Sequence, residues 1–369
     1  MKKTDVSCIP KEDVTFVSIT MIRAISIIAV VIENYTSYSL SSNVITVPSI
    51  FTYFVQNIAG TFVHLFFVIS GYGLTLPFLR EKTTNWKVWA RRRFLKIVVP
   101  YWVTVTITYS LTNICHYWIA NCVQPSYSWF TLFTYITFLR NFYSPGWTLN
   151  WTLWFMPIIV GLYIIFPLLL KVLKRYGVVY FMVFSLLLAN SPVLMLIQLG
   201  YPMSHQSSIF LFYVDEFAFG MVLAYLTNVY PELLCRLMKF RFFCLGIFFY
   251  FVSGLIAEFK LMGIGSIFYK DILECIGLYV MMLHICNLAN KFLSPSILNI
   301  FNKVSDNSYT IYLIHGPIIV LGLKPFYRTF FVDTMGNIPL ILSAGAFSIL
   351  MYFSAKSISL IGVLIRRRL

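Results

Sequence analysis

The first long apolar segment of the chain, residues 14–40, most constrains what the sequence can fold into. It is long enough to cross a bilayer, because a membrane-spanning helix needs ~20 apolar residues, yet it contains Arg23, Glu33 and Asn34. Arg23 and Asn34 lie about three helical turns apart, so a helix presents both on one face and Glu33 on another. An ionisable side chain inside a span is costly and therefore indicates a functional site.

The composition predicts an integral membrane protein. Of the 369 residues, 59% are hydrophobic and only 11% are charged, which is outside the range of soluble domains. The net charge of +15 does not indicate a nucleic-acid partner, because membrane proteins gather Lys and Arg in their cytoplasmic loops. The first apolar segment has no small-residue cleavage site, so we expect a retained span and not a signal peptide.

The seven cysteines give no sign of a metal centre. They contain no CxxC pair and no histidine at zinc spacing, so we expect neither a bound metal nor a disulfide framework. As a minor alternative, Cys115 and Cys122 face an oxidising compartment and pair there.

Apolar runs of spanning length predict an all-α, polytopic membrane protein with about ten transmembrane helices. The segment 126–147 is apolar but rich in aromatic residues and Thr, and we interpret it as an interfacial or re-entrant element. The predicted spans are residues 14–40, 55–79, 95–115, 150–170, 177–199, 208–228, 241–259, 264–290, 308–324 and 337–363.

The positions of Lys and Arg predict the orientation in the membrane. With the N-terminus inside, 21 of the 28 basic residues fall on the cytoplasmic side and 5 on the other, while Arg23 and Lys356 lie within spans. Cytoplasmic loops carry such an excess, so both termini are predicted to be cytoplasmic in a multi-pass protein of the inner or plasma membrane. Residues 14–363 then form one ten-helix domain between an N-terminal tail, residues 1–13, and a basic tail, residues 364–369.

His64 lies inside the second apolar segment, in the sequence FVHLFFVISGYGL. For a single histidine in such a segment, the simpler interpretation is a hydrogen bond to a neighbouring helix. Ser70, Gly71 and Gly73 follow it and allow close backbone approach, either of another helix or of a ligand.

Arg91, Arg92 and Arg93 stand with Lys96 at the start of the third span. Guanidinium groups match phosphate oxygens with paired hydrogen bonds, so this cluster is a candidate site for the phosphates of a cytosolic coenzyme. The alternative is a stop-transfer cluster attracted to anionic lipid headgroups. The presence of Arg23 in the first span favours the coenzyme.

Trp147, Trp151 and Trp154 open the fourth span, and Tyr163 lies deeper in it. An aromatic belt at the membrane interface explains such tryptophans, but aromatic planes also stack against saccharide rings. We therefore take Trp151, Trp154 and Tyr163 as candidate substrate-binding residues. His315 is a further intramembrane histidine, and is a candidate proton carrier or hydrogen-bond donor to a substrate.

Four acidic residues, Asp215, Glu216, Asp271 and Glu274, lie in later apolar segments. Asp271 and Glu274 share a helical face by their spacing, and Lys270 can pair with one of them. Acids at the outer end of a helix are often simply solvated, so the sequence assigns these four no role.

Six motifs of the chain resemble the acyltransferase-three family of integral membrane O-acyltransferases. The resemblance runs from about residue 14 to residue 363. In chain order the motifs are IRAISIIAVVIENY, LFFVISGYGL, WARRRFLKIVVPYW, LWFMPIIVGLYIIFP, FAFGMVLAYL and SYTIYLIHGPI.

The resemblance implies an enzyme that takes an acyl group, commonly acetyl from acetyl-CoA, on the cytoplasmic side. It would deliver this group to a hydroxyl of a cell-surface saccharide or lipid-linked glycan, without a metal. Arg23 matches the family's motif arginine, and residues 91–93 match the basic group that engages the donor. Trp154, Tyr163 and His315 match residues of the later motifs.

The chain departs from the family at Asn34, which occupies the position of the motif histidine. An amide cannot take a proton from an attacking hydroxyl, and losing a general base typically costs about 10² to 10⁴ in rate. Glu33, His64 or His315 could act as the base instead. We expect His64, because imidazole titrates near neutral pH and successive helices usually pack together. Asn34 could still orient the acyl carbonyl through its NH₂ group.

Two other functions fit the same sequence. A glycan or lipid exporter on the same scaffold needs no base, so it gains directly from Asn34. An inactive homologue is less favoured, because Arg23 and the arginine cluster are retained.

Overall fold

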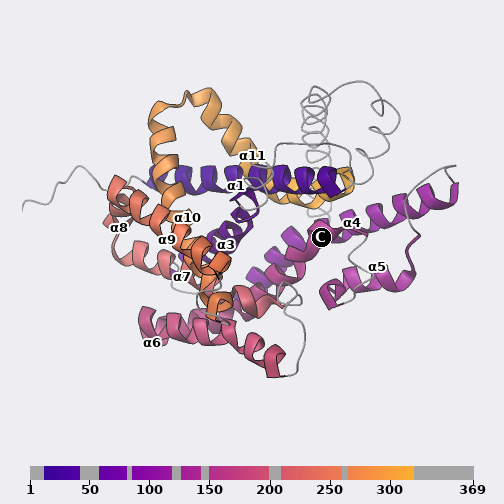
Figure 1. The fold of residues 1–369 in the computed structure, drawn as a ribbon, viewed down its shortest axis with the longest axis horizontal. Helices are drawn as coiled ribbons and strands as arrows, with labels where there is room; N and C mark the ends of the chain where they lie inside the picture. Colours follow the sequence, from indigo (N-terminus) through magenta and orange to yellow (C-terminus); the bar gives the residue numbers. More distant parts are fainter. Residues whose placement is uncertain are drawn as a thin grey trace, which may run out of the picture. The chain divides into compact units, whose positions relative to one another are not determined.

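The computed structural model describes residues 12–41, 58–80, 85–118, 126–142, 149–198, 209–259 and 265–319, and these ranges form helices and turns with no strand (Figure 1). Contacts group the chain into two compact units, which are described separately. Unit 1 comprises Met1–Val30, Ile58–Thr83 and Ile158–Ser305, and unit 2 comprises Val31–Asn57, Thr84–Pro157 and Asp306–Leu369. The described helices are α1 (Glu12–Ser41), α3 (Phe62–Arg80), α4 (Trp86–Trp118), α5 (Trp129–Ile136), η3 (Arg140–Phe142), η5 (Trp151–Trp154), α6 (Phe155–Gln198), η7 (Phe210–Tyr213), α7 (Val214–Val229), α8 (Glu232–Leu237), α9 (Phe240–Phe259), α10 (Gly265–Phe292) and α11 (Pro295–Ile318).

Six helices within the described ranges are long and apolar enough to cross a membrane, which confirms the predicted all-α class and membrane character. The predicted count of ten spans and the orientation of the termini are not established by these residues. The last predicted span, 337–363, and both tails lie outside them. The six candidate spans are Ser18–Ser37, Phe62–Arg80, Trp86–Tyr117, Trp151–Pro192, Phe210–Val229 and Asp271–Phe292.

Helix α6 contains a break that divides it into two. Its 44 residues would measure roughly 66 Å, about twice the thickness of the hydrocarbon core. Gly177 interrupts the helix with φ 78° and ψ −179°, a backbone conformation that residues other than glycine rarely adopt. The two halves match the predicted spans 150–170 and 177–199 in position. Before the break, Lys174 Nζ donates to the backbone carbonyl of Phe78 at 2.8 Å, near the end of α3 where carbonyls lack helical partners.

The core of unit 1 joins α3, α7, α8 and α10 to the first half of α1. Helix α3 is buried around most of its circumference, and Gly73 and Pro77 are exposed on the remaining face. This is typical of a helix packed well inside a bundle. Met21 and Ile22, next to Arg23 in sequence, belong to the same apolar cluster as Leu65 and Val68. The turn of α1 that carries Arg23 is therefore packed in the same core as the turn of α3 that follows His64.

Helices α3 and α7 cross at two glycines. A Cβ atom on Gly71 would lie 2.1 Å from the backbone oxygen of Phe217, and one on Gly220 would lie 2.0 Å from that of Val68. The two backbones thus touch directly, as at small-residue crossings in membrane bundles. Of the two roles considered for the glycines after His64, Gly71 serves helix packing, whereas a Cβ on Gly73 would meet nothing within 4 Å.

Gly71→Ala should lower the free energy of unfolding by about 1–3 kcal/mol, because the new methyl group meets rigid backbone and forces the helices apart. Gly73→Ala is the matched control, and should leave stability unchanged or raise it by up to about 1 kcal/mol through helix propensity. Thermal unfolding of the detergent-solubilised protein measures both. Equal effects of the two substitutions would contradict the crossing.

Unit 2 holds the segment after α4 against that helix through hydrogen bonds to backbone. Tyr101 Oη donates to the carbonyl of Tyr135, and Trp102 Nε1 to that of Ile136, each at 3.0 Å. The side-chain amide of Asn113 donates a hydrogen bond to the backbone carbonyl of Tyr127 and accepts one from its backbone N–H. Whether this part of the segment 126–147 is interfacial or re-entrant stays a prediction.

Helix α4 begins at Trp86, nine residues before the predicted span. Asn85 caps it, since its Oδ1 accepts from the backbone N–H groups of Lys87 and Val88 at 3.1 and 3.2 Å. The arginine cluster therefore lies on a helix.

Candidate active site

His64 and Glu216 form a close pair of ionisable side chains in unit 1. His64 Nδ1 lies 2.8 Å from Glu216 Oε1, and the two side chains are 15% and 1% exposed. The pair joins α3 to α7, about two helical turns from Gly71 along α3 and about one turn from Gly220 along α7. Sequence reasoning chose His64 but gave it no partner. The signal for Glu216 was an acid inside the apolar segment YVDEFAFGMVLAYL.

The contact with Glu216 fixes the proton on one side of the His64 ring. A carboxylate accepts hydrogen bonds, so Nδ1 carries the hydrogen and a neutral ring presents an unprotonated Nε2. Nε2 forms no hydrogen bond with any described residue. A histidine held by a carboxylate at one nitrogen and open at the other is the arrangement of a general base.

Three further acids surround this pair. Asp215 Oδ1 accepts from the backbone N–H of Glu216 at 2.9 Å, and Asp271 and Glu274 interact electrostatically with both His64 and Glu216. Asp215 and Glu274 are buried, at 4% and 6% exposed. Within the described residues, no group of three or more His, Cys, Asp or Glu side chains is arranged to hold a metal ion. The acids therefore make an electronegative setting for the histidine.

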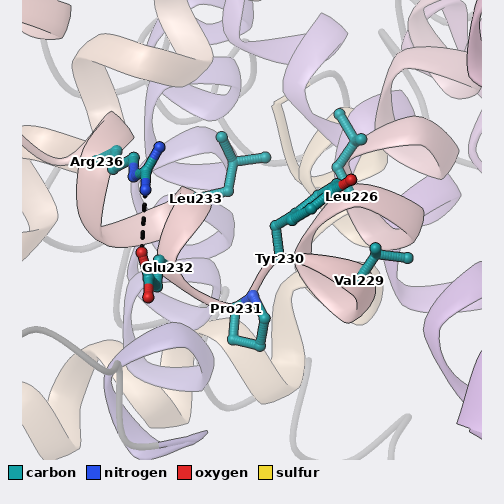
Figure 2. Close-up of a pocket in the computed structure, with 7 residues that line it drawn as sticks. All are labelled: Leu226, Val229, Tyr230, Pro231, Glu232, Leu233 and Arg236. Carbon is teal, nitrogen blue, oxygen red and sulfur yellow. Dashed lines mark hydrogen bonds and ion pairs between the residues drawn. The ribbon is translucent and has the colours of Figure 1, made fainter. Parts of the chain in front are cut away.

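A pocket of about 520 Å³ also lies in unit 1, where α7 turns into α8 (Figure 2). Glu232 and Arg236 form an exposed ion pair there, with Arg236 Nη2 3.0 Å from Glu232 Oε2. None of the candidate catalytic residues lines this pocket. Its lining residues are Leu226, Val229, Tyr230, Pro231, Glu232, Leu233 and Arg236.

A double-mutant cycle on His64→Ala and Glu216→Ala should give a coupling energy of about 1–3 kcal/mol, since each single change leaves a buried polar partner behind. The exposed Glu232–Arg236 pair has a similar contact distance and should give less than about 1 kcal/mol. Thermal or denaturant unfolding of seven proteins, with the wild type shared between the cycles, measures both coupling energies. Coupling no larger in the buried pair than in the exposed one would show that the His64 contact is not formed.

The remaining candidates of unit 1 are Arg23 and Tyr163. Arg23 is half-buried, between the buried residues Ile22 and Ala24. Tyr163 is half-buried too, and its ring centroid lies 6.4 Å from that of Phe217, the neighbour of Glu216. Tyr163 therefore packs close to the residue that follows Glu216 in α7.

In unit 2, His315 lies in the same region as η5, the short helix that contains Trp151 and Trp154. Its ring is fully buried, and Nδ1 lies 2.6 Å from the backbone carbonyl of Tyr312. Tyr312 Oη donates to the carbonyl of Thr152, inside the helix η5 that begins at Trp151 and ends at Trp154. Both tryptophans are half-buried. The structure thus brings His315, Trp151 and Trp154 into one region, which sequence distance did not indicate.

Arg140 is a buried cation that sequence reasoning counted only as a basic residue outside the spans. It is 0% exposed, its Cζ lies 5.1 Å from the centre of the Tyr135 ring, and Nη1 donates to Asn141 Oδ1 at 3.2 Å. Asn141 in turn donates to the carbonyl of Trp154 at 3.0 Å. Burial raises the pKa of Tyr135, against the opposing effect of Arg140, so its hydroxyl stays a donor. The sequence feature that could have indicated this buried cation is an arginine within the largely apolar and aromatic segment TLFTYITFLRNF.

The other candidates of unit 2 lie on α1 and α4. Asn34 is 8% exposed, and Glu33 Oε1 accepts from Ser37 Oγ at 2.9 Å. Arg91 and Arg92 are exposed, and Arg93 is half-buried. Because successive residues of a helix point about 100° apart, the three arginines cannot all face one phosphate. Arg92 and the exposed Lys96 share a face instead.

A family model described as an acyltransferase domain matches residues 16–355. This range takes in nearly all the described helices, both histidines and the arginine cluster. No curated protein and no solved structure matches the chain.

Proposed function

Because the chain belongs to the acyltransferase-three family, we propose that it is a membrane O-acyltransferase in which His64 replaces the family's missing base. The donor would be an acyl-CoA such as acetyl-CoA, and the acceptor would be a hydroxyl of a cell-surface or lipid-linked saccharide. The observation that carries the proposal is the 2.8 Å contact of His64 Nδ1 with the buried Glu216. Glu33 and His315 stay the other candidates for the base.

The proposed step transfers the acyl group directly. His64 Nε2 takes the proton of the acceptor hydroxyl while its oxygen attacks the thioester carbonyl carbon. The carbon–sulfur bond then breaks, and the thiolate of coenzyme A takes that proton from the imidazolium. The products are the acylated saccharide and free coenzyme A. Glu216 holds the ring and stabilises its positive charge during the step.

Exposed basic residues support a phosphate-bearing donor. Arg92 and Lys96 offer two cations on one face of α4, within reach of a soluble ligand. Cys115, near the other end of α4, is disulfide-bonded, which suits an oxidising compartment on that side of the membrane. Cys122, which the sequence offered as a partner for Cys115 only as a minor alternative, lies outside the described residues. The predicted orientation, with residues 91–93 on the cytosolic side, agrees with both features.

His64→Ala should lower kcat by about 10² to 10⁴ in a transfer assay, because a general base contributes that much. The assay supplies purified protein with labelled acetyl-CoA and a panel of saccharides and lipid-linked glycans, and measures labelled ester and free thiol. Glu232→Gln, at the exposed pair of Figure 2, is the control and should retain wild-type activity. If His64→Ala is fully active and His315→Ala is not, the base is His315.

The same assay separates the transferase from an exporter. A wild-type protein that consumes no acetyl-CoA with any acceptor, and that moves glycan across vesicles, would overturn the transferase. Asn34 is the feature that favours this alternative.

Arg23→Ala should raise the KM for acetyl-CoA by about 10-fold to 100-fold, as expected for losing a hydrogen bond to a charged group. The acceptor KM should stay unchanged, since the substitution touches only the donor. Lys171→Ala, an exposed basic residue of α6, controls for net charge. A rise in the acceptor KM alone would place Arg23 on the acceptor instead.

A further inference from the structure

A compact polar cluster in unit 2 joins Asn150, at the start of η5, to α11. Asn150 Oδ1 accepts from the backbone N–H and the Oγ1 of Thr152 at 3.2 and 2.8 Å. The backbone N–H of Asn150 donates to Tyr135 Oη at 2.9 Å, and its carbonyl accepts from that hydroxyl at 3.1 Å. These contacts fix the position of the amide. Its donor group, Nδ2, is buried and bonds no described residue.

His315 contributes the complementary atom from α11. A backbone carbonyl can only accept, so Nδ1, 2.6 Å from the carbonyl of Tyr312, carries the ring hydrogen. In the neutral ring Nε2 is then an acceptor. It is buried and, like Asn150 Nδ2, bonds no described residue.

The two atoms belong to one cluster because Gly316 touches Asn150. A Cβ on Gly316 would lie 2.4 Å from Asn150 Oδ1 and 2.4 Å from Thr152 Oγ1. The hydroxyl of Tyr312 also bonds the carbonyl of Thr152. Tyr312 and Gly316 of α11 therefore contact the start of η5, and His315 lies between them in the sequence. The cluster thus contains one buried donor and one buried acceptor that bond no described residue. Buried polar atoms in native proteins are normally hydrogen-bonded.

We propose that this cluster binds one hydroxyl group, which accepts from Asn150 Nδ2 and donates to His315 Nε2. A carbonyl oxygen cannot donate and an ammonium group cannot accept, whereas a hydroxyl does both. Water supplies that chemistry in the free protein. A saccharide hydroxyl can take its place, because η5 carries the half-buried Trp151 and Trp154, whose planes suit stacking on a sugar ring. That the bound hydroxyl belongs to a saccharide rests on the proposed function, whereas the presence of a hydroxyl-binding site does not.

Nitrogen-15 NMR of the full-length, histidine-labelled protein in lipid nanodiscs tests the site without turnover. The chain has five histidines, and His315→Asn identifies the signal of His315. We expect an unprotonated Nε2 shifted upfield by an accepted hydrogen bond in the free protein. Asn150→Asp, which replaces the donor with an oxygen of the same shape, should move that signal. Asn190→Asp, at a half-buried amide of α6, should not.

A second experiment adds methyl glucoside to the labelled protein, to distinguish a saccharide hydroxyl from water as the bound group. A further shift of the His315 signal with the probe assigns the site to saccharide, and an unchanged signal assigns it to water. A protonated Nε2, or one that accepts no hydrogen bond in the free protein, overturns the proposal. The wild-type spectrum decides this alone, even where a variant does not fold. Because the readout needs no acyl transfer, an inactive protein would refute the transferase and leave this test intact.

Discussion

The close crossing of α3 and α7 is the contact on which the proposed active site depends. At Gly71 and Gly220 each helix touches the backbone of the other, and this approach brings neighbouring side chains within direct reach. Two turns away along α3 and one turn away along α7, His64 and Glu216 are in direct contact at 2.8 Å. A wider separation would put water between them and leave the imidazole free to turn. The packing of unit 1 and the proposed chemistry of its histidine thus have a common cause.

Unit 2 holds its polar residues by another means, which is hydrogen bonding to backbone carbonyls. Tyr101, Tyr135 and Tyr312 each donate to a carbonyl of a different segment. Such bonds matter most where water is scarce, because an unpaired group there is costly. The same unit contains the fully buried side chains of Arg140 and His315.

The order and kind of the helices were predictable because apolar length is a local property. The first span was expected at 14–40 and α1 covers Glu12–Ser41, and the break of α6 at Gly177 falls at the start of a predicted span. Helix α4 shows where this reasoning stops. Hydropathy marks where apolar residues begin, but backbone hydrogen bonding continues through charged residues, so the helix starts at Trp86.

By itself, the sequence determined a helical membrane protein, its family motifs and the candidate histidines His64 and His315 inside apolar segments, because each of these is recorded in composition or short-range order. Only the tertiary structure decided which side chains meet. It buried Glu216 against His64, assigned Gly71 to a helix contact, and enclosed Arg140. The physical reason is that periodicity along one helix records how it is buried, whereas a contact such as His64–Glu216 joins positions 152 residues apart. Such a contact depends on the rotation and separation of two helices, which neither helix specifies alone.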